Sequence, residues 1–119
     1  MPLIFVYGTL KRGGSNHHYL AGQQFLGKAR TPPGYRLYEL RGYPGMIEKP
    51  DDQDGVTGEV WSIDEKCLAQ LDLLEGLVEG LYRRVPLALP APFARQAVET
   101  YVYARSVAGC PELGATWPV

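Results

Sequence analysis

A length of 119 residues, 45% of them hydrophobic, is enough for one domain with its own core, and we expect no second domain. The formal net charge is -1 and charges of both signs are interspersed, which excludes an extended basic surface for nucleic acid or for a membrane. No apolar run approaches the ~20 residues of a membrane span and the first residues lack the layout of a signal peptide, so we expect a cytoplasmic protein.

The first half of the chain predicts strands joined by turns rich in glycine and proline. Four apolar residues at 3–6 predict a strand that is buried on both faces. Ser15 or Asn16 is suited to cap a short helix over 17–21, which Gly22 ends. Further strands are expected at 24–30, 35–40 and 46–48, with turns at 31–34 and 42–45.

The second half contains the clearest helix. Alternation at 56–63 predicts a half-buried strand, in which Gly58 marks a bulge or a close approach of another segment. Asp64 is a good N-cap for a helix over 65–74, and Gly76 ends it. The apolar stripe of this helix consists of Leu68, Leu71 and Leu74. Two further alternating strands are expected at 81–87 and 98–105.

These elements predict an α+β fold. Six to seven mostly antiparallel strands, one main helix and short flanking helices suggest a small sheet that curls toward a barrel. No repeat or linker-like change of composition occurs before the last dozen residues, so we expect a single domain over 1–108. Residues 109–119 are expected to form a loosely attached C-terminal tail.

The turn after the first strand is a candidate ligand site. Gly8 follows the strand and lets the backbone leave it at angles that a side chain would forbid, and Thr9 adds a hydroxyl. Backbone N–H groups just past Gly8 lack a ladder partner, so water or a bound acceptor must satisfy them. Taken alone, this segment is better explained as an ordinary strand-to-loop turn, and other segments change that balance.

Other sites for phosphate or metal are poorly supported. Residues 8–15 fit the phosphate-loop pattern G-x-x-x-x-G-x-[ST], but Gly14 replaces the lysine that reaches the phosphates, so nucleotide hydrolysis is not expected. The two cysteines and two histidines have no metal-ligand spacing, and we expect neither a metal nor a disulfide: Cys67, Cys110, His17 and His18.

Glu75 is the candidate for acid–base chemistry. It follows Leu74 at the C-terminal end of the predicted helix, where the helix dipole and apolar surface both raise the pKa of a carboxyl group. A carboxyl tuned in this way suits a general acid or base. A solvated glutamate at a fraying helix end is the alternative. Glu79 lies four residues on, but Gly76 breaks the helix, so a glycosidase-like carboxylate pair is not expected and Glu79 is interpreted as a solvated loop residue.

Tyrosines and arginines in the predicted strands are secondary candidates. Three phenols can point inward with a hydroxyl that needs a partner: Tyr7, Tyr82 and Tyr103. Three arginines are expected to be solvated, although one could bind a substrate carboxylate in a bidentate manner: Arg83, Arg84 and Arg105.

Four segments together form a recognisable combination. They are Phe-Val-Tyr-Gly-Thr-Leu-Lys-Arg-Gly at 5–13, Gly-Glu-Val-Trp at 58–61, Leu-Asp-Leu-Leu-Glu-Gly at 71–76 followed by Leu-Tyr-Arg-Arg at 81–84, and Tyr-Val-Tyr at 101–103. In order and spacing they resemble the γ-glutamylcyclotransferase-like family, also called AIG2-like or BtrG-like, over most of the chain. The Tyr-Gly-Thr-Leu form is closer to the γ-glutamylamine cyclotransferase branch. The chain departs from the family pattern in the leucine before Glu75 and in a link at 76–80 that lacks proline.

The resemblance implies a cyclising enzyme. Its cavity would bind the glutamyl part of a γ-glutamyl amine or amino compound and release 5-oxoproline plus an amine, with no metal or organic cofactor. Glu75 would be the general acid/base. Six residues would bind the substrate, four of them partly through backbone N–H groups: Tyr7, Gly8, Thr9, Leu10, Tyr82 and Tyr103. Leaving-group specificity is expected to depend on the cavity mouth, at Lys11, Arg12 and the turn 43–45.

Two other interpretations stay open at this point. A non-catalytic module could capture a small carboxylate or acyl metabolite in the same cavity, although a negative Glu75 would oppose such a ligand. A different amide or acyl transfer is the other, because a fold alone does not determine the chemistry. For assembly we expect a monomer or a weak homodimer.

Overall fold

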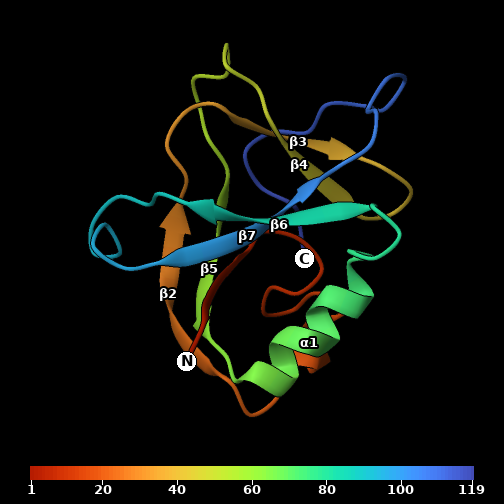
Figure 1. The fold of residues 1–119 in the computed structure, drawn as a ribbon. Helices are drawn as coiled ribbons and strands as arrows, with labels where there is room; N and C mark the ends of the chain where they lie inside the picture. Colours follow the sequence, from red (N-terminus) through yellow and green to blue (C-terminus); the bar gives the residue numbers. More distant parts are fainter.

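Seven strands, one α-helix and one short 3-10 helix, η1, make up the computed structural model, which describes residues 1–119 (Figure 1). In chain order they are β1 (Leu3–Val6), η1 (His17–Leu20), β2 (Gln24–Arg30), β3 (Tyr35–Glu39), β4 (Pro44–Glu48), β5 (Thr57–Ser62), α1 (Glu65–Leu74), β6 (Tyr82–Leu87) and β7 (Val98–Tyr103). Most predicted elements are present within one or two residues of their predicted ends. The largest shifts are of two residues: β4 begins two residues before the predicted strand, and β7 ends two residues before its predicted end.

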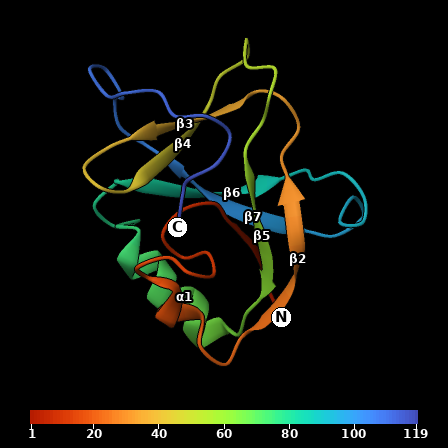
Figure 2. The ribbon, with the colours of Figure 1, turned by 180° about the vertical axis from the view of Figure 1, so that it is seen from behind.

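The strands form two sheets. The larger one has the order β2-β5-β1-β7-β6 and the smaller one pairs β3 with β4. All pairs are antiparallel except β1 with β7, which is parallel. The larger sheet curls around the loop after β1 but does not close, because its outer strands β2 and β6 do not pair (Figure 2). The α+β class is therefore confirmed, whereas the single barrel-like sheet of six to seven strands is corrected to a mixed sheet of five strands plus a hairpin.

The main helix begins and ends as predicted. Asp64 accepts a hydrogen bond from the N–H of Cys67 at 2.7 Å and so caps the first turn. Gly76 has a φ of +64°, the left-handed conformation that favours glycine after a helix. Leu68 and Leu71 of α1 are buried against the core. The end of this helix is thus set by its sequence, which places Glu75 at a defined point.

The short segment η1 differs from its prediction. It is a 3-10 helix, and neither candidate residue caps it through a side chain. Asn16 instead donates its Nδ2–H to the Oγ1 of Thr9 at 3.0 Å. The amide group therefore supports the loop after β1, an interaction that local helix rules do not anticipate.

The core has one part on each face of β1. Ile4 and Val6 pack with α1 on one side, and Phe5 and Tyr7 pack toward the β3–β4 hairpin on the other. The predicted burial of the first strand on both faces is thus confirmed. A side chain at Gly58 would meet the carbonyl oxygen of Val6 at 2.4 Å, so this glycine marks a close approach. The bulge lies in β2 instead, between residues 25 and 27.

The segment 109–119, expected to be loosely attached, is held to the domain. Leu113 donates its N–H to the carbonyl of Leu37 at 2.9 Å, and Ala115 accepts from the N–H of Thr57 at 2.8 Å. Leu113 and Trp117 also pack against the core. Isolated contacts of this kind leave no periodic pattern in the sequence, which explains the difference.

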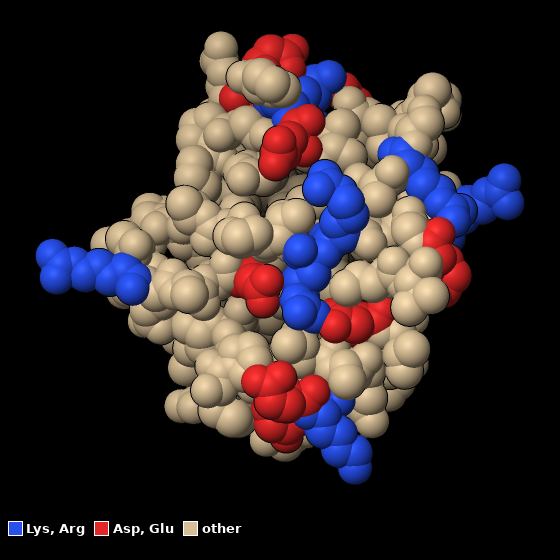
Figure 3. Space-filling view, in the orientation of Figure 1, with Lys and Arg blue, Asp and Glu red and all other residues tan.

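The surface and the helix content bear on possible partners. On the face in Figure 3, acidic and basic side chains lie next to each other, and no basic patch covers that face. The protein has no helix of the length and apolar character that a bilayer crossing requires.

Candidate active site

A cavity of about 340 Å³ lies between the loop after β1 and the C-terminal end of α1. Figure 1 shows these two segments side by side, with the loop in red and the helix in green. Segments from all parts of the chain line it: Phe5–Leu10, Ser15, Asn16, Gly42–Pro44, Leu74, Glu75, Tyr82 and Tyr101. The fold therefore brings Glu75 and the residues Tyr7–Leu10 to one cavity, together with Tyr82.

The loop after β1 offers free backbone donors. The N–H groups of Gly8, Thr9 and Leu10 have no partner within the protein, as their place beyond the strand predicts. The expected reason for glycine at position 8 is wrong, because the φ of Gly8 is not positive. A side chain there would instead meet the Cγ of Pro44 at 2.5 Å. Gly8 thus permits close contact between this loop and Pro44, the first residue of β4.

Side chains hold this loop in place. Arg12 donates its backbone N–H to Oε1 and its Nε–H to Oε2 of the buried Glu59, each at 3.0 Å. The Nδ1 of His17 hydrogen-bonds the carbonyl of Leu10 at 3.0 Å. Asn16 contacts Thr9 as described above. Because both ends of the loop are fixed, the free N–H groups are held in position before any ligand binds.

Glu75 is the only charged residue in the lining of the cavity. It forms the C-cap of α1 and donates its backbone N–H to the carbonyl of Leu71 at 2.9 Å. Its carboxyl group accepts no hydrogen bond from the protein, and burial raises its pKa from 4.5 to about 7. The direction of this shift is the one expected from the apolar surface, and Glu75 is partly buried rather than fully solvated. Glu79, by contrast, is exposed, as expected.

Two tyrosines of the cavity hydrogen-bond backbone groups of other segments. Tyr7 donates its hydroxyl to the carbonyl of Tyr101 at 2.7 Å and accepts from the N–H of Met46 at 3.2 Å. Tyr82 donates to the carbonyl of Pro44 at 2.7 Å. Burial raises the pKa of both phenols above its ordinary value, so both stay protonated at neutral pH. Their hydroxyl protons are already used to fix the walls.

Tyr103 does not line the cavity, whereas Tyr101 does. The ring of Tyr103 packs edge-on against Tyr82 with the ring centres 5.3 Å apart. Tyr101 donates its hydroxyl to Oδ1 of Asp72 at 2.7 Å, and Asp72 is also paired with Arg84. Residues two apart on a strand share a face, so the pattern Tyr-Val-Tyr contained the signal for Tyr101. Arg84 is partly buried rather than solvated as expected.

The mouth of the cavity differs from the prediction in part. Tyr43 and Pro44 of the expected turn line it, but Lys11 and Arg12 do not. Sequence reasoning did not select Ser15 or Asn16 as lining residues, because it treated them as candidate caps of the short helix. No Lys, Arg or His lines the cavity, so a ligand carboxylate there must be bound by neutral donors. No cluster of three or more His, Cys, Asp or Glu side chains is arranged to hold a metal ion.

Residues 4–118 match the model of the family described as gamma-glutamyl cyclotransferase, AIG2-like. The chain belongs to this family. The resemblance seen in the sequence is thereby confirmed, and the protein is an enzyme of the gamma-glutamyl cyclotransferase kind.

Individual relatives agree with the family match. A Vibrio cholerae protein with the provisional name gamma-glutamylcyclotransferase is 51% identical over 88 residues, which cover 74% of this chain and 73% of that one. The human gamma-glutamylaminecyclotransferase is 35% identical over 123 residues, covering 89% and 80%. Among solved structures, an AIG2-like protein from Mus musculus has a TM-score of 0.74 at 29% identity and covers 97% of this chain and 87% of its own.

Proposed function

We propose that the cavity binds a γ-glutamyl compound and that the protein converts it to 5-oxoproline and a free amine. The observation that carries this proposal is the raised pKa of Glu75, about 7, in the same cavity as the free N–H groups of residues 8–10. A carboxyl group with such a pKa can both accept and return a proton near neutral pH. The family and its named relatives support the type of reaction.

The reaction is an intramolecular exchange of one C–N bond for another. The α-amino nitrogen of the substrate attacks its γ-carbonyl carbon and closes a five-membered ring, and the bond from that carbon to the leaving nitrogen breaks. Ionised Glu75 takes the proton from the attacking nitrogen and then donates it to the leaving nitrogen, so that the carboxylate is restored. One group in both roles contributes roughly 10²- to 10⁴-fold to the rate, the general range for such catalysis.

The loop after β1 supplies the second element of catalysis. The carbonyl oxygen becomes negative as the ring closes, and the N–H groups of Gly8, Thr9 and Leu10 are the unpaired donors at the cavity wall. Each donor directed at such an oxygen is worth roughly 10²- to 10³-fold. Tyr7 and Tyr82 act on the shape of the cavity, because their hydroxyls already bind backbone carbonyls. Through the shape of the cavity, these two tyrosines contribute to substrate binding by holding the substrate in the curled conformer that ring closure needs.

The charges of the cavity favour amines over amino acids as leaving groups. A γ-glutamyl amine has one carboxylate, whereas a γ-glutamyl amino acid has two. With no cation in the lining and with Glu75 as its one charged residue, a second carboxylate would lie unpaired beside a negative charge. We therefore propose γ-glutamyl amines as the preferred substrates.

The decisive experiment measures 5-oxoproline release from matched γ-glutamyl compounds. For Glu75→Gln we expect at least about a thousand-fold loss of kcat, since the amide cannot transfer the proton. Glu79→Gln is the matched control, because Glu79 is exposed and outside the cavity, and we expect it to be fully active. The wild-type kcat/KM should rise with pH through an apparent pKa near 7, as Glu75 of the free enzyme ionises.

Three results would contradict parts of this proposal. Full activity of Glu75→Gln would remove Glu75 from the mechanism. Equal or faster turnover of a γ-glutamyl amino acid would contradict the preference for amines. Ligand-dependent shifts in melting temperature without any 5-oxoproline from the wild-type protein would favour a binding module instead.

A further inference from the structure

A groove next to the cavity collects basic side chains. It has a volume of about 700 Å³ and shares no lining residue with the cavity. Four cationic side chains and one carboxylate line it: Lys11, Arg12, Lys28, Arg30 and Glu59. The whole chain has a formal net charge of -1, so the fold concentrates positive charge here that is dispersed along the sequence.

Strand pairing explains this concentration. Lys28 and Arg30 are two residues apart on β2 and therefore share one face of the sheet. They lie opposite Glu59 and Thr57 of β5, respectively. Because Arg12 donates two hydrogen bonds to Glu59, the loop after β1 brings its own cations to the same groove.

Lys11 is a buried cation without a charged partner. Its residue is only 7% exposed, and its Nζ donates to the carbonyl of Trp117 at 2.6 Å. No carboxylate lies within ion-pair distance of this Nζ. Burial lowers the pKa of Lys11, whereas Glu59 raises it in part. Buried charges are ordinarily compensated, and a neutral carbonyl does not do so.

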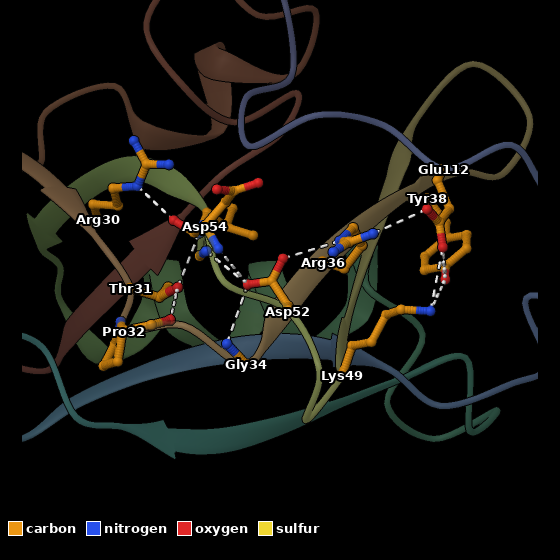
Figure 4. Close-up of polar contacts among 12 residues, drawn as sticks. Arg30, Thr31, Pro32, Gly34, Arg36, Tyr38, Lys49, Asp52, Asp54 and Glu112 are labelled. Carbon is orange, nitrogen blue, oxygen red and sulfur yellow. Dashed lines mark hydrogen bonds and ion pairs between the residues drawn. The ribbon is translucent and has the colours of Figure 1, made fainter.

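The other cations keep free donors. Arg12 uses its Nε–H for Glu59 and stacks over the ring of Phe25 at 3.8 Å, which leaves both of its Nη groups unpaired. Arg30 donates its Nε–H to the carbonyl of Asp54, and in Figure 4 its two terminal nitrogens are directed away from that contact. Lys28 is exposed and has no hydrogen-bond partner in the protein.

We propose that this groove binds a multivalent oxyanion, specifically a small polyphosphate or phosphate ester. The planar guanidinium group matches two phosphate oxygens at once, and the groove offers two such groups and two ammonium groups. A neutral ligand would leave these charges uncompensated, and an ion with one charge would pair with few of them. The proposal does not depend on the reaction in the cavity.

The test is calorimetric titration of the full chain with tripolyphosphate at low ionic strength, where exposed charges are least screened. Pyrophosphate, inorganic phosphate and citrate are the comparison ligands. We expect affinity to fall from tripolyphosphate to phosphate. For the double variant Lys28→Gln/Arg30→Gln we expect about tenfold weaker binding of tripolyphosphate, since both side chains are exposed donors to the ligand. The matched control is Arg83→Gln/Arg95→Gln, which removes two exposed cations outside the groove and should bind as the wild type does.

Amide chemical shifts during the same titration locate the ligand. Shifts at Thr57, Gly58 and Thr116 would support the groove, which these residues line. Several results would overturn the proposal: no binding of tripolyphosphate at millimolar concentration, equal weakening in both double variants, or shifts centred on Arg83 and Arg84. Tighter binding of citrate than of tripolyphosphate would overturn the assignment to phosphate.

Discussion

The buried Asp52 and the partly buried Glu75 lie in two regions of this protein that act on a carboxyl group in opposite ways. At the end that carries the β3–β4 hairpin, Asp52 accepts hydrogen bonds from the N–H groups of Gly34, Asp54 and Gly55 and from the Nε–H of Arg36 (Figure 4). Burial alone would raise the pKa of Asp52, but these donors outweigh it and lower the pKa to about 2. Glu75 has burial without donors, and its pKa is raised to about 7.

The difference shows what separates a structural carboxylate from a reactive one. Asp52 ties the turn before β3 to the loop before β5, and Arg36 extends the network to Glu112 of the C-terminal segment. A carboxylate that accepts four hydrogen bonds from the protein is fixed in place and stays ionised. Glu75 keeps its oxygens free for a ligand, and the fold bears the cost of its desolvation.

The largest expected effect on stability is at Asp52. Asp52→Ala leaves three backbone N–H groups and Arg36 without their acceptor, and we expect it to lower the free energy of unfolding by about 3–5 kcal/mol. Urea unfolding of the variant measures this loss. Asp51→Ala is the matched control, because Asp51 is an exposed neighbour without such contacts, and we expect a change within about 0.5 kcal/mol. A loss of less than about 1 kcal/mol for Asp52→Ala would contradict the structural role of this network.

Substitution of Glu75 should change the free energy of unfolding in the opposite direction from substitution of Asp52. The pKa of Glu75 is raised in the folded state, so the folded protein binds more protons than the unfolded chain between pH 4.5 and about 7, and stability falls as pH rises through that window. Glu75→Gln removes this loss. At pH 8 we expect the variant to be more stable than the wild type, by on the order of 3 kcal/mol, and at pH 4 we expect no gain. If urea unfolding shows the same difference at both pH values, the desolvation of Glu75 is not the cause.

Protonation of Asp52 should lower the stability of the protein at acidic pH. The pKa of Asp52 is lowered in the folded state, so its contribution is present above pH 4 and is lost as pH falls toward about 2. Thermal melting of the wild type and of Asp52→Asn should therefore differ at pH 6 and converge near pH 2. Parallel curves over this range would show that the charge of Asp52 does not contribute.

Local signals predicted the parts of the site that lie on one element. Asp64 and Gly76 mark the ends of α1, so the sequence alone places Glu75 at a helix end beside apolar residues. The unpaired N–H groups after β1 follow from the end of a strand. Both depend on residues only a few positions apart.

Features that depend on contacts between distant segments were not predictable in this way. The need for glycine at position 8 comes from Pro44, and the parallel pairing of β1 with β7 joins the two ends of the chain. The basic groove exists because the register of β2 and β5 aligns side chains that appear interspersed in the sequence. The contacts of residues 109–119 are likewise single long-range bonds.

The smallest expected effect tests how firmly the cavity loop is held compared with the Asp52 network. The Oγ1 of Thr9 accepts one hydrogen bond, from Asn16, and lines the cavity. Thr9→Ala removes this contact but leaves the backbone N–H groups, which Arg12 and Glu59 still hold. We expect KM for the γ-glutamyl substrate to rise about three- to tenfold with kcat nearly unchanged, as the loss of one hydrogen bond predicts. Thr9→Ser restores the hydroxyl and should restore KM. Unchanged kinetics in both variants would mean that Thr9 is structural only, whereas a large loss of kcat would show that its hydroxyl contacts the reacting atoms.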